Sequence, residues 1–256
     1  ILHRQGSILE RLGDRDGALL KLRGALQAGR DVWSAGGASN PNFAELGDLM
    51  NALGNMHKMA GDSDPAMEFY RESLSIRQEI GDQLSVANVK NNIGAVLAAL
   101  GRTEEAKAFY VDALRTKTAL LGCDNTETGR TLANLGQIYM DEKEFDKAFQ
   151  YFSEGTRIFR LNLGDKHFEV GVCAHNLGII WDGRSDHKKA LRHYAEAYAI
   201  FQRTAEDAHL LSFTLHNMGA IYIKRQKYSR AVRCLYDALD CKLDTLGLDA
   251  EETAET

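Results

Sequence analysis

The sequence repeats itself six times, and a glycine marks the same point of each copy. An alanine follows each glycine twelve residues later. The glycines are Gly6, Gly54, Gly94, Gly136, Gly178 and Gly219, and the alanines are Ala18, Ala66, Ala106, Ala148, Ala190 and Ala231. Successive glycines are 48, 40, 42, 42 and 41 residues apart, a period typical of arrays in which one supersecondary unit is copied and stacked. We therefore expect a stacked repeat scaffold rather than a fold built around a catalytic centre.

Each copy predicts two helices. The first carries the glycine, with an apolar residue before it and usually a large one three positions later, as in Leu135 and Tyr139 around Gly136. The second begins near the alanine and places apolar residues at every fourth position, as in Ala106, Tyr110 and Leu114. This spacing puts one apolar stripe along a helix. Each unit is thus expected to be a helical hairpin.

Short polar stretches separate the two helices of a unit and predict tight turns. Four units have a good capping residue ten positions after the glycine, and we predict these residues to be the N-caps of the second helices. They are Asp16, Asp64, Asp146 and Ser229. Pro65, directly after Asp64, suits a first helical position.

The repeated glycines predict close packing within each hairpin. A glycine inside a helix costs about 1 kcal/mol relative to alanine, so six at one phase indicate that packing requires them. We expect the missing side chain to let the first helix approach the second, where a residue sixteen positions later, such as Tyr70 or Phe152, fills the neighbouring space. A larger residue in place of the glycine should overpack this contact, at a cost of about 1–3 kcal/mol.

The pattern resembles the tetratricopeptide repeat, which has Leu-Gly, an aromatic residue three later, alanine at +12, an aromatic at +16 and alanine at +19, where every unit of this sequence has a small residue. Residues 1 to 247 fit it. The resemblance implies an all-α fold, a right-handed α-solenoid of about six tetratricopeptide helical hairpins in one superhelical domain over 1–256. The 40- to 42-residue units are similar to those of kinesin light chain and of Pins-type adaptors. The predicted repeats are approximately 1–30, 42–81, 83–122, 125–164, 167–205 and 208–247, with a loop over 31–41.

Composition narrows the class of protein. The chain is 44% hydrophobic with a net charge of −5, and it contains no apolar run long enough for a membrane span, so neither nucleic acid nor membrane insertion is expected. Its cysteines, Cys123, Cys173, Cys234 and Cys241, show no paired metal spacing and are expected to be free, mostly buried thiols in a reducing, cytoplasmic compartment. No catalytic constellation or phosphate-binding glycine loop emerges, so we predict no enzyme activity, no metal and no cofactor.

Amide side chains gather on the predicted first helices, which in stacked hairpins of this family line the concave face. Asparagine is a mediocre helix former, so its recurrence at one phase indicates selection for something other than propensity. Two positions before the glycine stand Asn92, Asn134, Asn176 and Asn217, and three before stand Asn51, Asn91, His175 and His216. Asn55, Asn88, Arg130 and Gln137 are expected to face the same groove. By resemblance to kinesin light chain, the four asparagines would form a ladder that grips a bound peptide.

These observations favour a protein-interaction scaffold or adaptor that binds a peptide segment of a partner in its concave groove. An amide carries both a donor and an acceptor, which matches the main chain of an extended peptide. In an alternative reading the amides only bond to neighbouring units and hold their register. Two alternative functions are a regulatory or sensor region of a larger multidomain protein and a structural strut in a large assembly. Because Leu246-Gly247 repeats the Leu121-Gly122 lead-in to another unit, we expect a segment of a larger protein.

Overall fold

The computed structural model describes residues 43–204 and 207–246, which form ten α-helices joined by short turns. The first predicted unit, the loop over 31–41 and the predicted N-cap Asp16 lie outside the described residues. The helices are α3 (Phe43–Met59), α4 (Ser63–Glu79), α5 (Gln83–Ala99), α6 (Thr103–Leu121), α7 (Thr126–Asp141), α8 (Phe145–Leu163), α9 (Phe168–Gly183), α10 (His187–Thr204), α11 (Ala208–Lys224) and α12 (Tyr228–Leu246).

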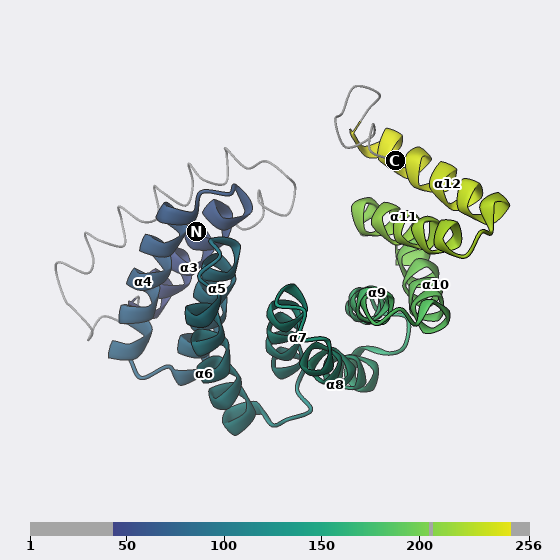
Figure 1. Ribbon diagram of the computed structural model, residues 1–256. Coiled ribbons are helices and arrows are strands. Elements are labelled where there is room, and N and C mark those ends of the chain that lie inside the picture. Colours follow the sequence, from purple (N-terminus) through teal and green to yellow (C-terminus); the bar gives the residue numbers. More distant parts are fainter. Residues whose placement is uncertain (1–42, 205–206, 247–256) are drawn as a thin grey trace. The chain divides into compact units, whose positions relative to one another are not determined.

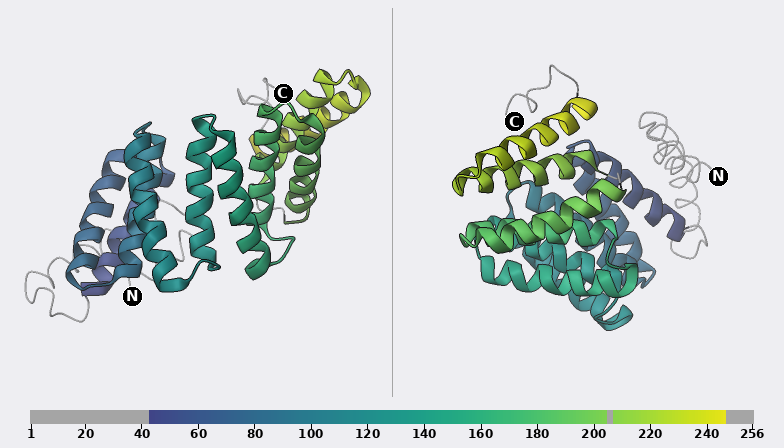
Figure 2. Two further views of the ribbon diagram at one scale, coloured as in Figure 1. Left: turned by 60° about the horizontal axis from the view of Figure 1, so that its bottom comes forward. Right: turned by 90° about the vertical axis from the view of Figure 1, so that its right-hand side faces the viewer.

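The helices pair in sequence as antiparallel hairpins and divide into two compact units (Figure 1). Unit 1 ends at Gly122 and contains the hairpins α3–α4 and α5–α6, whereas unit 2 begins at Cys123 and contains α7–α8, α9–α10 and α11–α12. Within a unit, the second helix of one hairpin packs against the first helix of the next: α4 on α5, α8 on α9, and α10 on α11 (Figure 2). The predicted all-α solenoid of helical hairpins is confirmed.

The turn inside each hairpin differs from the prediction. The residue seven positions after the repeat glycine has a left-handed backbone, at Gly61, Gly101, Lys143, Ser185 and Gln226. This conformation ends the first helix and redirects the chain at once, so the second helix begins only two residues later. Asp62 is therefore the N-cap of α4. The predicted N-caps Asp64, Asp146 and Ser229 are wrong, because all three lie in the first helical turn, and Pro65 is the third residue of α4 rather than the first.

The repeat glycines lie against the second helix of their own hairpin, as predicted. A Cβ atom added to Gly178 would lie 2.6 Å from the ring of Tyr194, and one added to Gly54 would lie 2.5 Å from the ring of Tyr70. In the last hairpin Leu235 takes the place of the ring, 2.8 Å from a Cβ on Gly219. The absence of a side chain at this position thus sets the distance between the two helices.

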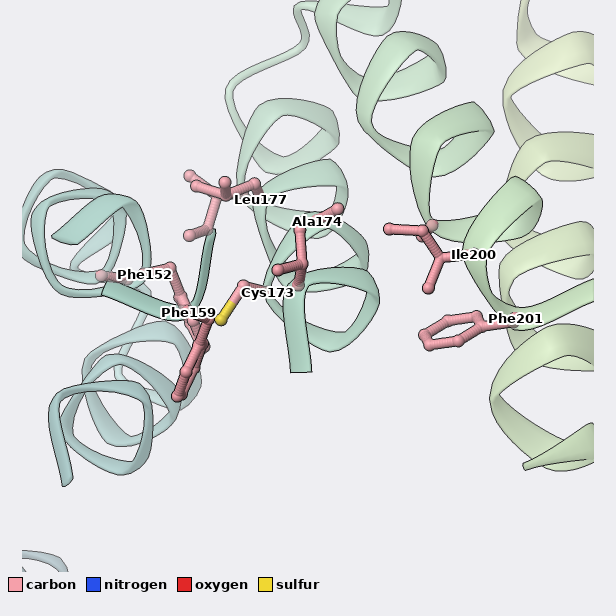
Figure 3. Packing of buried hydrophobic residues seen from close by; sticks show 11 residues of the cluster. Phe152, Phe159, Cys173, Ala174, Leu177, Ile200 and Phe201 are labelled. Carbon is pink, nitrogen blue, oxygen red and sulfur yellow. The ribbon is translucent and has the colours of Figure 1, made fainter. Parts of the chain in front are cut away.

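A second glycine contact, which the sequence analysis missed, lies at the open end of the hairpins. A Cβ on Gly171 would lie 2.8 Å from the ring of Phe201, and one on Gly129 would lie 3.0 Å from the ring of Phe159. Both rings belong to the large core cluster of unit 2, together with Phe152, Cys173, Ala174, Leu177 and Ile200 (Figure 3). The available signal was a recurring small residue seven positions before the repeat glycine: Gly47, Ala87, Gly129, Gly171 and Ser212.

The cysteines are free, as predicted, but they are not mostly buried. Only Cys173 is buried, Cys123 is exposed, and Cys234 and Cys241 are half-buried. The exposure of each cysteine follows from its position. Cys173 lies on the core-facing side of α9, whereas Cys123 lies in the turn between α6 and α7. Among the helices described, none has the length and apolar character needed to cross a membrane.

Candidate peptide-binding surface of the first helices

The first helices of neighbouring hairpins contact one another within each unit. In unit 1 α3 contacts α5, and in unit 2 α9 contacts both α7 and α11. All twelve predicted site residues lie on these helices: Asn51 and Asn55 on α3, Asn88, Asn91 and Asn92 on α5, Arg130, Asn134 and Gln137 on α7, His175 and Asn176 on α9, and His216 and Asn217 on α11.

In unit 1 the amides bond to the protein itself. The Nδ2 of Asn92 donates to the Oδ1 of Asn51 over 2.9 Å and so joins α5 to α3. The hydroxyl of Tyr70 donates to the Oδ1 of Asn55 over 2.7 Å. Both bonds are partly buried. The first joins two hairpins and favours the alternative in which the amides bond to neighbouring units, whereas the second lies within one hairpin. Asn91 is also half-buried, and the half-buried Asn88 has its Oδ1 buried without a partner among the described residues.

We expect Asn92→Ala to lower the free energy of unfolding by about 0.5–1.5 kcal/mol, because the substitution removes the amide–amide bond and leaves the Oδ1 of Asn51 unpaired. Urea denaturation followed by circular dichroism measures the change. Gln78→Ala, at an exposed position of α4, is the control and should change stability by less than about 0.5 kcal/mol. Equal stability of the two variants would contradict the register role.

Two of the predicted residues on α7, Arg130 and Gln137, form polar contacts with other side chains. The exposed Arg130 donates to Glu127 on its own helix over 2.6 Å and to Glu169 of α9 over 2.9 Å. The side chain of Gln137 donates to Asp141, also on α7, over 2.9 Å. Asn134 lies between these two residues in the sequence of α7 and is half-buried. Arg130 thus links two neighbouring first helices while its guanidinium stays accessible to solvent.

His175 does not belong to an accessible surface. Its side chain is only 6% exposed, and its Nδ1 lies 2.8 Å from the Oγ1 of Thr214 on α11. Burial lowers the pKa of His175 to about 4, so the ring is neutral at pH 7. His175 therefore joins α9 to α11.

The two predicted residues of α11 are half-buried. Asn217 forms a side-chain hydrogen bond with Tyr194 of α10, the same tyrosine that packs on Gly178. His216 has its Nδ1 buried without a hydrogen-bond partner in the described part of the chain. Asn217 thus has a bond between hairpins, as Asn92 does in unit 1.

Asn176 on α9 is the member of the ladder with an amide available for a ligand. Its side chain is half-buried, and its amide atoms remain accessible to solvent. It makes no hydrogen bond with any described residue. Phe213 on the neighbouring α11 is 46% exposed, an apolar residue that the sequence analysis did not single out. We call Arg130, Asn134, Gln137, Asn176 and Phe213 the first-helix face of unit 2.

Models of the tetratricopeptide repeat match residues 46–80, 85–160, 134–203 and 183–244 of this sequence. The matches extend over most of the chain. The chain belongs to the tetratricopeptide-repeat family. Domains of this family typically take part in protein–protein interaction, and their fold is generally non-catalytic.

Solved structures share the fold at low sequence identity. BtubC (BKLC) from P. vanneervenii aligns with a TM-score of 0.76 at 22% identity, over 91% of this chain and 92% of that one. A putative kinesin light chain from Podosopora anserina with nearly identical TPR-like repeats aligns with a TM-score of 0.64 at 15% identity, over 80% of this chain and 98% of that one. The similarity to kinesin light chain repeats that the sequence indicated is thus confirmed at the level of the fold.

A curated relative is the outer dynein arm-docking complex subunit 4 of Danio rerio, 26% identical over 141 residues. The match includes 55% of this chain and 28% of that protein. The chain therefore aligns with little more than a quarter of the length of this relative.

Proposed function

We propose that this tetratricopeptide segment is an adaptor that binds a peptide segment of a partner protein on the first-helix face of unit 2. The observation that carries the proposal is the amide of Asn176, which is partly exposed and makes no bond within the described residues. A primary amide offers two donors and an acceptor, and an extended peptide presents N–H and C=O groups that match them. Family membership supports the same function, because repeats of this kind typically bind proteins.

The surroundings of Asn176 suit a peptide main chain with one apolar side chain. Arg130 and Gln137 provide further donors on α7, and the exposed part of Phe213 on α11 provides an apolar contact. The pairing of Arg130 with Glu127 and Glu169 leaves no dense positive cluster on this face. Recognition would therefore rest on main-chain hydrogen bonds and apolar contact rather than on ligand charge.

Asn176→Ala is expected to weaken peptide binding several-fold, because one hydrogen bond is worth about 0.5–1.5 kcal/mol net. The double substitution Asn134→Ala with Asn176→Ala should weaken it about tenfold or more. The probes are peptides selected from a random 12-residue library on the wild-type chain, and fluorescence anisotropy measures their affinity. Gln150→Ala, at an exposed position of α8, is the matched control and should leave binding unchanged.

Thermal unfolding separates the two roles of these asparagines. If Asn176→Ala leaves the melting temperature unchanged while affinity falls, the amide acts on the ligand. A melting temperature that falls with Asn176→Ala would assign it to register, as for Asn92. Selected peptides that all bind the double variant as tightly as the wild type would refute the proposed surface.

A further inference from the structure

A cavity of about 430 Å³ lies on another side of unit 2, between the second helices α8 and α10. Residues of α9 form its floor, among them Ala174, Leu177 and Trp181. At about 100° per residue these three lie within about 60° of one another around α9, whereas Asn176 lies about 100° to 160° away from them. The cavity, which we call the second-helix cavity, is therefore separate from the first-helix face.

The floor of the second-helix cavity is apolar and aromatic. The ring of Phe149 from α8 meets the ring of Trp181 edge to face, with centroids 5.5 Å apart. Leu177 and Ala174 continue this surface along α9, and both are buried parts of the core cluster (Figure 3). The Nζ of Lys189 lies 3.9 Å from the centroid of the Trp181 ring, so an apolar side chain of a ligand would share this ring with the lysine.

The rim of the cavity is cationic. Arg157 and Arg160 approach it from α8, Lys189 and Arg192 approach it from α10, and the one carboxylate among its lining residues, Glu196, pairs with Arg160. Arg160 also lies 3.6 Å from Asp165, so three of the four cations have carboxylate partners, and the unpaired positive charge of the rim is that of Arg192. It favours an anionic ligand through charge complementarity.

The cations of the rim differ in how far the protein itself neutralises them. Arg157 pairs with Glu154 and Asp124, and the Nζ of Lys189 lies 3.1 Å from Asp186. Arg192 is exposed and has no carboxylate partner among the described residues. Of the rim cations, Arg192 can therefore pair with an anionic ligand without first breaking an ion pair with the protein.

Two polar atoms in the wall of the cavity also lack partners. They are Nε1 of Trp181 and Nδ1 of His193, both buried and without a hydrogen bond to any described residue, although the Nδ1 of His193 lies 3.9 Å from the Oε2 of Glu196. A buried polar atom without a partner costs about 1–3 kcal/mol, and such atoms in native proteins commonly bond to water or to a bound group. Both atoms have almost no accessible surface, so they belong to the wall of the cavity and are not themselves contacts for a ligand.

We propose that the second-helix cavity binds an acidic peptide segment of a partner protein. One apolar side chain of the segment would lie against Trp181 and Phe149, and a flanking carboxylate would pair with Arg192. The volume lies in the range of ligand-binding pockets. This second site does not rest on the first-helix face, and the two sites favour different peptides because only this one depends on ligand charge.

Two substitutions test the two parts of the site. Arg192→Glu reverses the unpaired charge, and Ser153→Phe, at a half-buried lining position of α8, fills the cavity. Matched controls occupy the same positions of neighbouring repeats: Arg233→Glu on α12 and Ala195→Phe on α10, both exposed. The probes are peptides from the random 12-residue library, selected on the wild-type chain and counter-selected on the chain with both cavity substitutions.

We expect the selected peptides to carry several Asp or Glu residues around one apolar residue and to bind with an affinity that falls as salt rises. Arg192→Glu should weaken them about tenfold in fluorescence anisotropy, Ser153→Phe should abolish binding, and the two controls and Asn176→Ala should leave it unchanged. Circular dichroism must show an unchanged melting temperature for each variant used. Replacing the apolar residue of the peptide by alanine should weaken binding by a similar factor.

Several results would overturn the proposal. The first is that no recovered peptide depends on Arg192 and Ser153. The second is that Arg233→Glu weakens binding as much as Arg192→Glu does. The third is that replacing the apolar residue of the peptide leaves its affinity unchanged, which would indicate a simple anion site. Peptides that respond only to Asn176→Ala would refute this cavity and support the first-helix face. Peptides that respond only to Arg192→Glu and Ser153→Phe would support the cavity, and they leave the first-helix face to its own test with Asn134→Ala and Asn176→Ala.

Discussion

Phe201→Ala is expected to lower the free energy of unfolding of unit 2 by about 3–5 kcal/mol. The ring of Phe201 is 1% exposed and lies between Gly171 and Phe168, whose ring centroid is 5.5 Å away. Glycine has no side chain with which to fill the space left by the ring, and the two helices of the hairpin are held apart by their other contacts. A large residual cavity should therefore remain, and the cost should be near the upper part of the range.

Urea denaturation monitored by circular dichroism measures the loss, and amide hydrogen exchange locates it in α9 and α10. Hydrogen exchange is needed because arrays of repeats do not always unfold in one step. Leu161→Ala in α8, where the side chain is 64% exposed, is the control and should change stability by less than about 0.5 kcal/mol. A loss below about 1 kcal/mol for Phe201→Ala would mean that the hairpin closes over the vacated space.

The second large effect is expected from Gly178→Ala, which should destabilise unit 2 by about 1–3 kcal/mol although alanine is the better helix former. The new methyl group would lie 2.6 Å from the ring of Tyr194, closer than van der Waals contact allows. Tyr194 is fully buried, with its ring against His175 and its hydroxyl bonded to Asn217, so the ring has little freedom to move. The backbones of α9 and α10 must separate instead.

The control for this prediction is another helical glycine with a different environment. A Cβ on Gly155 of α8 would meet its nearest atom, the carbonyl oxygen of Gly129, at 3.5 Å, an ordinary contact distance. Gly155→Ala should therefore leave stability unchanged or raise it by up to about 1 kcal/mol through helix propensity. Gly178→Ala should lower the urea midpoint, whereas Gly155→Ala should leave it unchanged or raise it. If both stabilise the chain, the glycine contact does not set the spacing of the hairpin.

The repeat made the fold predictable from the sequence. Six copies of one pattern fixed the period, the apolar stripe of each helix and the partner of each repeat glycine, because these depend on residues within one hairpin. The turn was predicted less well. The left-handed residue that ends each first helix is glycine at Gly61 and Gly101 but Lys143, Ser185 and Gln226 elsewhere, so residue type gave no consistent signal for it.

The candidate site could be predicted only in part. The phase of the asparagines correctly placed them on the first helices, but it could not tell which amides bond to other repeats. Asn92 meets Asn51 across 41 positions of sequence, and His175 meets Thr214 across 39. Such bonds depend on the rotation and separation of neighbouring hairpins, which a pattern within one repeat does not contain.

The amino-acid sequence alone therefore determined the repeated hairpin, its two helices and the glycine contact inside it. The reason is that close packing between adjacent helices requires small and apolar residues at regular positions of the sequence. Only the tertiary structure decided which polar groups are already bonded and which stay available. It separated Asn176, whose amide is open to a ligand, from Asn92 and Asn217, and it brought the cations of α8 and α10 around Trp181. The physical reason is that hydrogen bonds and cavities between hairpins arise from distances between segments some forty residues apart.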